Sequence, residues 1–221
     1  MSRTRAAGFC YLITIVCGVF AELAVRSKLI VSDDAAATAA NILAHETLYR
    51  AALAADIVML AAYIAVTLLL YGLFKPVSPD ASLFAAWFSL IGIAVLAVNS
   101  LNHVAPLLLL QRAAYLDAFT APQLQSLALF ALKLHGRGYA ISGAFFGVYC
   151  ITIGWLAFKS GFLPRFIGVL MFAGGAGYAI STFVGLLSPA TAARLPDFTI
   201  AGGIAELALT LSLLFARKDS P

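Results

Sequence analysis

Long apolar segments separated by short polar stretches run along the whole chain. Each apolar segment is close to, or longer than, the roughly 20 residues that a helix needs to cross a bilayer. The separators carry proline, glycine or charged residues, which end one helix and begin the next. We therefore expect six transmembrane helices, over about residues 8–26, 49–74, 82–110, 139–158, 166–187 and 198–216.

Two further segments have a helical pattern but are less uniformly apolar. The first, about residues 33–48, begins at Ser32-Asp33-Asp34, which suits a helix N-terminus. The second, about residues 122–134, begins with a proline in its first turn. We expect both to be amphipathic helices on the extracytoplasmic side. The run His135-Gly136-Arg137-Gly138 should then be a joint, where two glycines interrupt the helix before the next span.

The composition supports the same conclusion. The chain of 221 residues is 62% hydrophobic and 11% charged, and its mean hydropathy is +0.98. A soluble domain is about 45–50% apolar and about 25% charged, so this chain lacks the polar groups to cover a water-facing surface. We expect a single all-α domain over residues 1–221, a polytopic integral membrane protein. Its formal charge of +4 reflects basic residues at the ends of spans, so nucleic acid is not an expected partner.

The placement of basic residues indicates an orientation. Seven of them lie on the side of the termini, namely Arg3, Arg5, Lys75, Lys159, Arg165, Arg217 and Lys218. Seven also lie on the other side, but there the connections are longer and contain acidic residues such as Asp33 and Asp117. The positive-inside rule applies best to short loops. We therefore expect a multi-pass protein of the bacterial cytoplasmic membrane, with both termini cytoplasmic and its first helix retained rather than cleaved as a signal.

One span carries a polar face. Asn99, Asn102, His103 and Pro106 stand at positions i, i+3, i+4 and i+7, which share one side of a helix. Lipid offers no hydrogen bonds, so this face must point at protein or water.

The other spans contribute isolated polar residues, and counting from the helix ends puts them at a similar depth. We expect one outer-leaflet pocket with the ligand-binding residues Glu22, Arg26, Asp56, Asn99, Asn102, His103, His135, Arg137, Tyr178 and Glu206. Arg26 would anchor an anionic group of the ligand, since its guanidinium stays charged, and His103 would transfer protons. The alternative is a set of separate structural pairs, with Glu22 on Arg26 and Asp56 on Arg50 or His103. Glu46 likewise stands four residues before Arg50.

The residues for cofactor or metal chemistry are few. His103 and His135 are weak metal-ligand candidates, but no HExxH or HxxxH pair is present, and we expect neither a metal nor a cofactor. Cys10, Cys17 and Cys150 lie inside apolar segments without a CxxC pair, which is typical of apolar filling. The sequence contains no GxSxG nucleophile elbow.

Four segments carry a resemblance to a known family: residues 21–26 (AELAVR), 32–42 (SDDAAATAANI), 70–77 (LYGLFKPV) and 160–165 (SGFLPR). Together they resemble the bacterial domain of unknown function 4386, over nearly the whole chain. The resemblance implies a six-span bacterial membrane protein. It implies no activity and no catalytic residues.

Three functions remain open at this point. The first is binding or transport of a small polar or amphipathic ligand that enters from the extracytoplasmic side, with membrane lipids as the surrounding partners. The second is an intramembrane enzyme that uses a carboxylate and a histidine as acid and base on a lipid-like substrate, its candidates being His103, His135, Asp56 and Glu206. The third is an accessory or sensor protein with a purely structural polar network.

Overall fold

The computed structural model describes residues 2–216, and this part of the chain is helical with no strand. Arg217 and Lys218, which the orientation argument counts, lie outside the described residues. The elements are α1 (Arg3–Val19), the π-helix η1 (Phe20–Arg26), α2 (Ser27–Leu29), α3 (Ala35–Ala44), α4 (Glu46–Phe74), α5 (Pro79–Leu110), the 3-10 helix η2 (Ala114–Leu116), α6 (Ala121–Ser160), α7 (Arg165–Leu187), α8 (Pro189–Ala192) and α9 (Thr199–Leu214).

Five helical stretches are long and apolar enough to cross a membrane: Arg3–Leu29, α4, α5, α6 and α7. The 16-residue α9 is apolar but shorter. The expected all-α class is therefore confirmed for the described residues, and the five apolar stretches are compatible with a membrane helical bundle.

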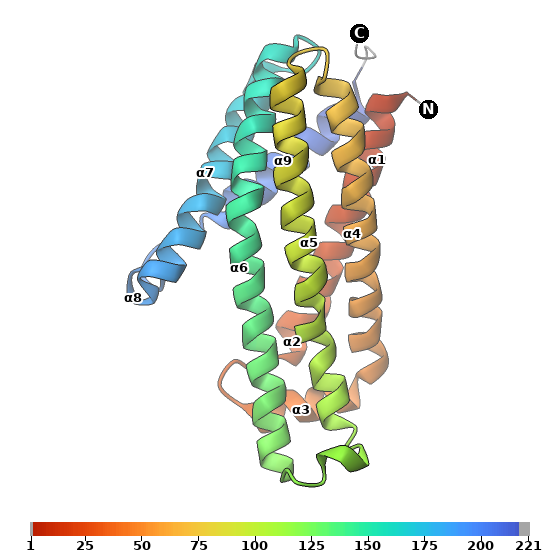
Figure 1. The fold of residues 1–221 in the computed structure, drawn as a ribbon, viewed down its shortest axis with the longest axis vertical. Coiled ribbons are helices and arrows are strands. Elements are labelled where there is room, and N and C mark those ends of the chain that lie inside the picture. The colour runs from red at the N-terminus through yellow and green to blue at the C-terminus, as the bar shows by residue number, and fades with distance from the viewer. Residues whose placement is uncertain (1, 217–221) are drawn as a thin grey trace.

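The long helices form a closed ring, because each packs against the next (Figure 1). Going round, α4 contacts α5, α5 contacts α6, α6 contacts α7, α7 contacts α9, α9 contacts α1, and α1 returns to α4. The start of α1 lies beside the end of α9, since Gly8 packs against Leu213 and Leu214. The two ends of the described chain therefore lie at the same end of the bundle.

Two boundaries differ from those expected. α6 is one helix of 40 residues, about 60 Å long at 1.5 Å per residue, so the interruption expected at His135-Gly136-Arg137-Gly138 is wrong. The amphipathic segment 122–134 is simply the first part of this helix. The physical reason is packing: the backbone at Gly138 lies directly against the side chain of Asn99 on α5, and this contact holds the segment helical. The segment 33–48 is instead divided, since α3 ends before His45 and α4 begins at Glu46.

The helix starts follow local chemistry. Asp34 caps α3 by accepting a hydrogen bond from the backbone N–H of Ala37, at 2.8 Å. Thr120 and Gln123 form a capping box at the start of α6. α3 then packs across α6 at the end of the bundle opposite to the N-terminus (Figure 1). These caps satisfy backbone groups that the first turn of a helix leaves without partners.

Candidate functional site

The first helix changes its winding where its charged residues occur. η1 contains both Glu22 and Arg26, and the backbone N–H of Ser27 bonds to the carbonyl of Glu22, five residues earlier. Such π-helical turns inside α-helices are rare and are frequent at functional sites. Nothing in the residue pattern of this segment distinguishes it from an ordinary α-helix, so the sequence did not reveal it.

Arg26 is the centre of a buried ion-pair group. It is 3% exposed. Its Nε donates to Oε2 of Glu22 at 2.7 Å, and its Nη1 donates to Oδ2 of Asp56 at 2.7 Å. The Glu22 side chain is 60% exposed, whereas that of Asp56 is buried. Two carboxylates therefore share one guanidinium, and the group carries an excess of negative charge.

His103 extends this group onto α5. Its Nδ1 lies 3.1 Å from Oδ2 of Asp56 and 3.3 Å from Nη1 of Arg26. A carboxylate oxygen only accepts hydrogen bonds, so Nδ1 carries the hydrogen that faces Asp56. The backbone carbonyl of His103 accepts a hydrogen bond from the hydroxyl of Tyr49 at 2.7 Å, and the Tyr49 ring meets the imidazole edge-on. Both contacts fix the orientation of the imidazole.

His135 lies next to His103 and is held by Asn99. The two imidazole centroids are 5.0 Å apart. Asn99 Nδ2 donates to the His135 carbonyl at 2.8 Å, and His135 Nδ1 lies 3.2 Å from the Asn99 carbonyl, to which it donates. Asn102 Nδ2 donates to Asn99 Oδ1 at 3.0 Å. These reciprocal bonds join α5 to α6 and set the tautomer of His135.

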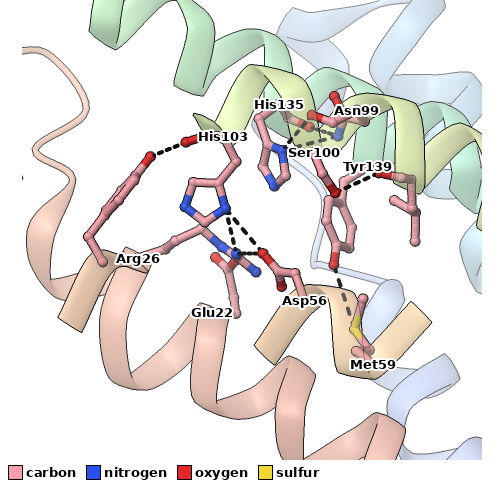
Figure 2. A network of polar contacts seen from close by, with 11 residues as sticks. Glu22, Arg26, Asp56, Met59, Asn99, Ser100, His103, His135 and Tyr139 are labelled. Atoms are coloured by element: carbon pink, nitrogen blue, oxygen red, sulfur yellow. Dashed lines mark hydrogen bonds and ion pairs between the residues drawn. The ribbon is translucent and has the colours of Figure 1, made fainter. Parts of the chain in front are cut away.

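Three buried acceptor atoms in this region have no hydrogen-bond partner in the described structure: Asp56 Oδ1, His103 Nε2 and His135 Nε2. Because Nδ1 is the donor in both histidines, Nε2 of each neutral ring carries a lone pair. Figure 2 shows the two rings side by side, with Asp56 and Arg26 below them. The arrangement can accept hydrogen bonds or protons.

The sequence-based site is therefore brought together only in part. One group, which we call the polar cluster, contains seven of the expected residues: Glu22, Arg26, Asp56, Asn99, Asn102, His103 and His135. Arg137 lies on the exposed side of α6. Of the two alternative partners expected for Asp56, the structure pairs it with His103. The other, Arg50, pairs with Glu46 at 2.7 Å.

Glu206 and Tyr178 are not part of the polar cluster. Glu206 accepts a hydrogen bond from the hydroxyl of Tyr63 at 3.1 Å, and Tyr63 is seven residues further along α4 than Asp56. Counting depth from the helix ends failed here because α9 is short and starts part of the way down the bundle, after α8 (Figure 1). Tyr178 packs against Gly202, one turn before Glu206.

Sequence reasoning missed two aromatic residues beside the polar cluster. Tyr49 holds the backbone of His103, as described above. The ring of Tyr139 lies 5.3 Å from that of His135, and its hydroxyl points at the sulfur of Met59, at 4.0 Å (Figure 2). Tyrosines at helix ends are common in membrane proteins, so neither residue gave a distinctive signal.

Two surface hollows lie where α5 leads into α6, near Arg112, Asp117 and Phe119, and neither is lined by a residue of the polar cluster. Within residues 2–216, no three His, Cys, Asp or Glu side chains are placed to hold one metal ion.

Comparison with known proteins gives one match. The model of the family described as "Domain of unknown function (DUF4386)" matches residues 6–216. No curated protein and no solved structure matches the chain.

Proposed function

The chain belongs to the DUF4386 family, whose description assigns no activity, and we propose from the polar cluster that it binds or transports a small ligand that donates hydrogen bonds. The ligand is neutral or cationic. It reaches the cluster from the extracytoplasmic side of a bacterial cytoplasmic membrane, which the protein crosses six times with both termini in the cytoplasm.

One observation carries this proposal: three unpartnered acceptor atoms, Asp56 Oδ1, His103 Nε2 and His135 Nε2, lie on side chains that are at most 5% exposed. A buried polar atom without a partner destabilises the fold by about 1–3 kcal/mol. A ligand with N–H or O–H groups would remove that cost and gain affinity from it. Binding is therefore the role that best accounts for all three atoms.

The charge of the cluster decides which ligands fit. Nε and Nη1 of Arg26 are already engaged by Glu22 and Asp56. An anionic ligand group at Arg26 would be repelled by both of these carboxylates. The expectation that Arg26 anchors an anion is therefore replaced by a preference for hydrogen-bond donors, and the excess carboxylate favours a positive charge.

The position along the helices suits entry from one side. Asp56 lies 18 residues before Phe74, or about 27 Å along α4. A hydrocarbon layer about 30 Å thick that begins at the Lys75 end would place the polar cluster near its opposite boundary. The exposed side chain of Glu22 lies at the edge of the cluster, where a cation would first meet it. In this arrangement α9 is the sixth span and completes the ring.

The test uses variants that delete only the free nitrogens. In His103→Asn and His135→Asn, the asparagine amide replaces Nδ1 as donor, while Nε2 is lost. We expect native mass spectrometry of the wild-type protein, released from mild detergent, to show a bound small molecule that is absent from the double variant. His45→Asn is the matched control, since His45 is exposed and its Nδ1 also bonds to a backbone carbonyl.

A second assay uses defined probes. At millimolar concentrations, far below those at which guanidinium denatures proteins, ethylammonium and guanidinium chloride should raise the melting temperature of the wild type more than that of the double variant. Sodium acetate should not. A wild type without any adduct and without stabilisation by either cation contradicts the proposed function.

A second candidate rests on the Asp56–His103 contact. A carboxylate that orients Nδ1 of a histidine leaves Nε2 as a general base, which is the arrangement of many hydrolytic sites. If the protein is an enzyme, the wild type should convert the bound molecule to a product, whereas a binding protein should release the molecule unchanged.

A further inference from the structure

Glu206 forms a second polar group, separate from the polar cluster and deeper in the bundle. Tyr63, which donates to it, lies 11 residues before Phe74, or about 16 Å along α4. That distance is close to half of a hydrocarbon layer about 30 Å thick. Glu206 is therefore at the level where an ionised carboxylate is most costly.

The groups that face Glu206 are all uncharged. Tyr63 on α4 donates to Oε1 at 3.1 Å, and the Cys150 thiol on α6 approaches the same oxygen at 3.7 Å. Tyr11 on α1 extends the contact, its hydroxyl lying 3.5 Å from that of Tyr63. Tyr178 on α7 packs one turn away, against Gly202. Within residues 2–216, Glu206 forms no ion pair.

The same group contains a buried hydroxyl without a partner. Tyr149 is 1% exposed, and its OH has no hydrogen bond in the described structure. Its ring lies edge-on to that of Tyr63, with centroids 6.2 Å apart. A hydroxyl oxygen has two lone pairs, so Tyr149 adds a free acceptor to the same buried group of tyrosines.

The packing limits what can bind here. Tyr63 stacks on Phe146 with centroids 5.0 Å apart, and the rings of Tyr11 and Tyr63 are 5.6 Å apart. Such spacings are those of rings in direct contact, so the tyrosines do not form an open cage around an organic cation. A proton requires no such space, because it is held on the carboxylate oxygen itself.

From this geometry we propose that Glu206 is a proton-binding site in the middle of the membrane-spanning region. A proton from the aqueous phase forms an O–H bond with one carboxylate oxygen, the negative charge is lost, and water remains from the hydronium ion. The new O–H needs an acceptor, and the Tyr63 hydroxyl, 3.1 Å from Oε1, is one. The proposal does not depend on a ligand at the polar cluster.

Proton binding would also change contacts between helices. In the ionised state Glu206 accepts from Tyr63, which links α9 to α4. The protonated acid can donate instead, so that Tyr63 is free to donate to Tyr11 on α1. One proton thus reverses a hydrogen-bonded chain that crosses three helices, and α4 carries both this chain and Asp56.

The experiment is infrared spectroscopy of the full-length protein in phospholipid nanodiscs over a series of pH values. We expect the difference between the wild-type and Glu206→Gln spectra to contain a C=O stretching band of a protonated carboxyl group, which grows as the pH is lowered. In Tyr63→Phe the protonated carboxyl group loses its hydrogen-bond partner, so the band should shift to higher frequency. This second variant keeps the test valid if Glu206→Gln does not fold.

Glu46→Gln serves as the matched control, because Glu46 lies at the start of α4, pairs with Arg50 and should not contribute to the band. The proposal is overturned if the wild type shows no such band at any pH at which it stays folded. It is equally overturned if the band is unchanged in both Glu206→Gln and Tyr63→Phe. A native mass spectrum without a ligand would leave this result untouched.

Discussion

Arg26 Nη1 lies 2.7 Å from Asp56 Oδ2, and both side chains are almost completely removed from solvent. This contact joins the π-helical end of the first helix to α4, at the level where His103 of α5 contacts Asp56. Four predictions follow from this region and from the way the surrounding helices pack.

Asp56→Asn should destabilise the protein strongly. The substitution leaves the buried guanidinium of Arg26 with only Glu22 as a carboxylate partner, and removing one member of a buried pair typically destabilises by about 3–5 kcal/mol. Thermal unfolding in detergent should show a large fall in melting temperature. Glu46→Gln, which removes an exposed pair with Arg50, should change stability by less than about 1 kcal/mol. Equal effects of the two substitutions would argue against a central role of the Arg26–Asp56 contact.

Replacing both charges should be milder than replacing one. In Arg26→Met/Asp56→Leu no buried charge of this pair remains, and apolar replacements of buried ion pairs are often neutral or stabilising. We expect the double variant to be more stable than either single variant when all are measured by the same unfolding assay. Strictly additive losses would show that the two side chains do not act as a pair. Loss of the bound adduct together with retained stability would separate binding from folding.

Gly138→Ala and Gly136→Ala should have opposite effects. A Cβ on Gly138 would overlap the side chain of Asn99, which is held by its bonds to His135, whereas a Cβ on Gly136 would meet nothing within 4 Å. We expect Gly138→Ala to destabilise by about 1–3 kcal/mol through overpacking. Gly136→Ala should stabilise by about 0.5–1 kcal/mol through helix propensity. Parallel melting curves of the two variants measure both values.

The orientation can be read from cysteine labelling in intact cells. Cysteine at Asp33, whose side chain is 97% exposed, should react with a membrane-impermeant thiol reagent in a background where Cys10, Cys17 and Cys150 are replaced. Cysteine at Lys75, at the other end of the bundle, should react only after the cells are opened. The reverse pattern would place the polar cluster on the cytoplasmic side and refute ligand entry from outside.

Local regularities of the sequence determined much of the structure. Apolar length and proline-containing turns place most helices within a few residues of their ends, because a backbone in hydrocarbon must satisfy its hydrogen bonds inside one helix. Spacing of four residues was enough to pair Glu22 with Arg26 and Glu46 with Arg50, since such residues are neighbours on a helix. The shared face of Asn99 and His103 was predicted in the same way, and each makes the interhelical contacts that such a face requires.

Contacts between segments that are far apart in the sequence determined the rest of the structure. Two glycines predicted a helix break at residues 135–138, yet α6 continues there because Gly138 fits closely against Asn99. Rules based on neighbouring residues cannot predict that contact, because Asn99 lies on another helix. The same is true of Glu206. Its hydrogen-bond partner Tyr63 is 143 residues away in the sequence, and this hydrogen bond depends on where the short α9 starts in the bundle. Periodicity shows which side of a helix is polar. The neighbouring helix that the polar side contacts, and the depth of that contact, depend on how side chains from six helices fill a common interior. That interior forms only when the chain folds.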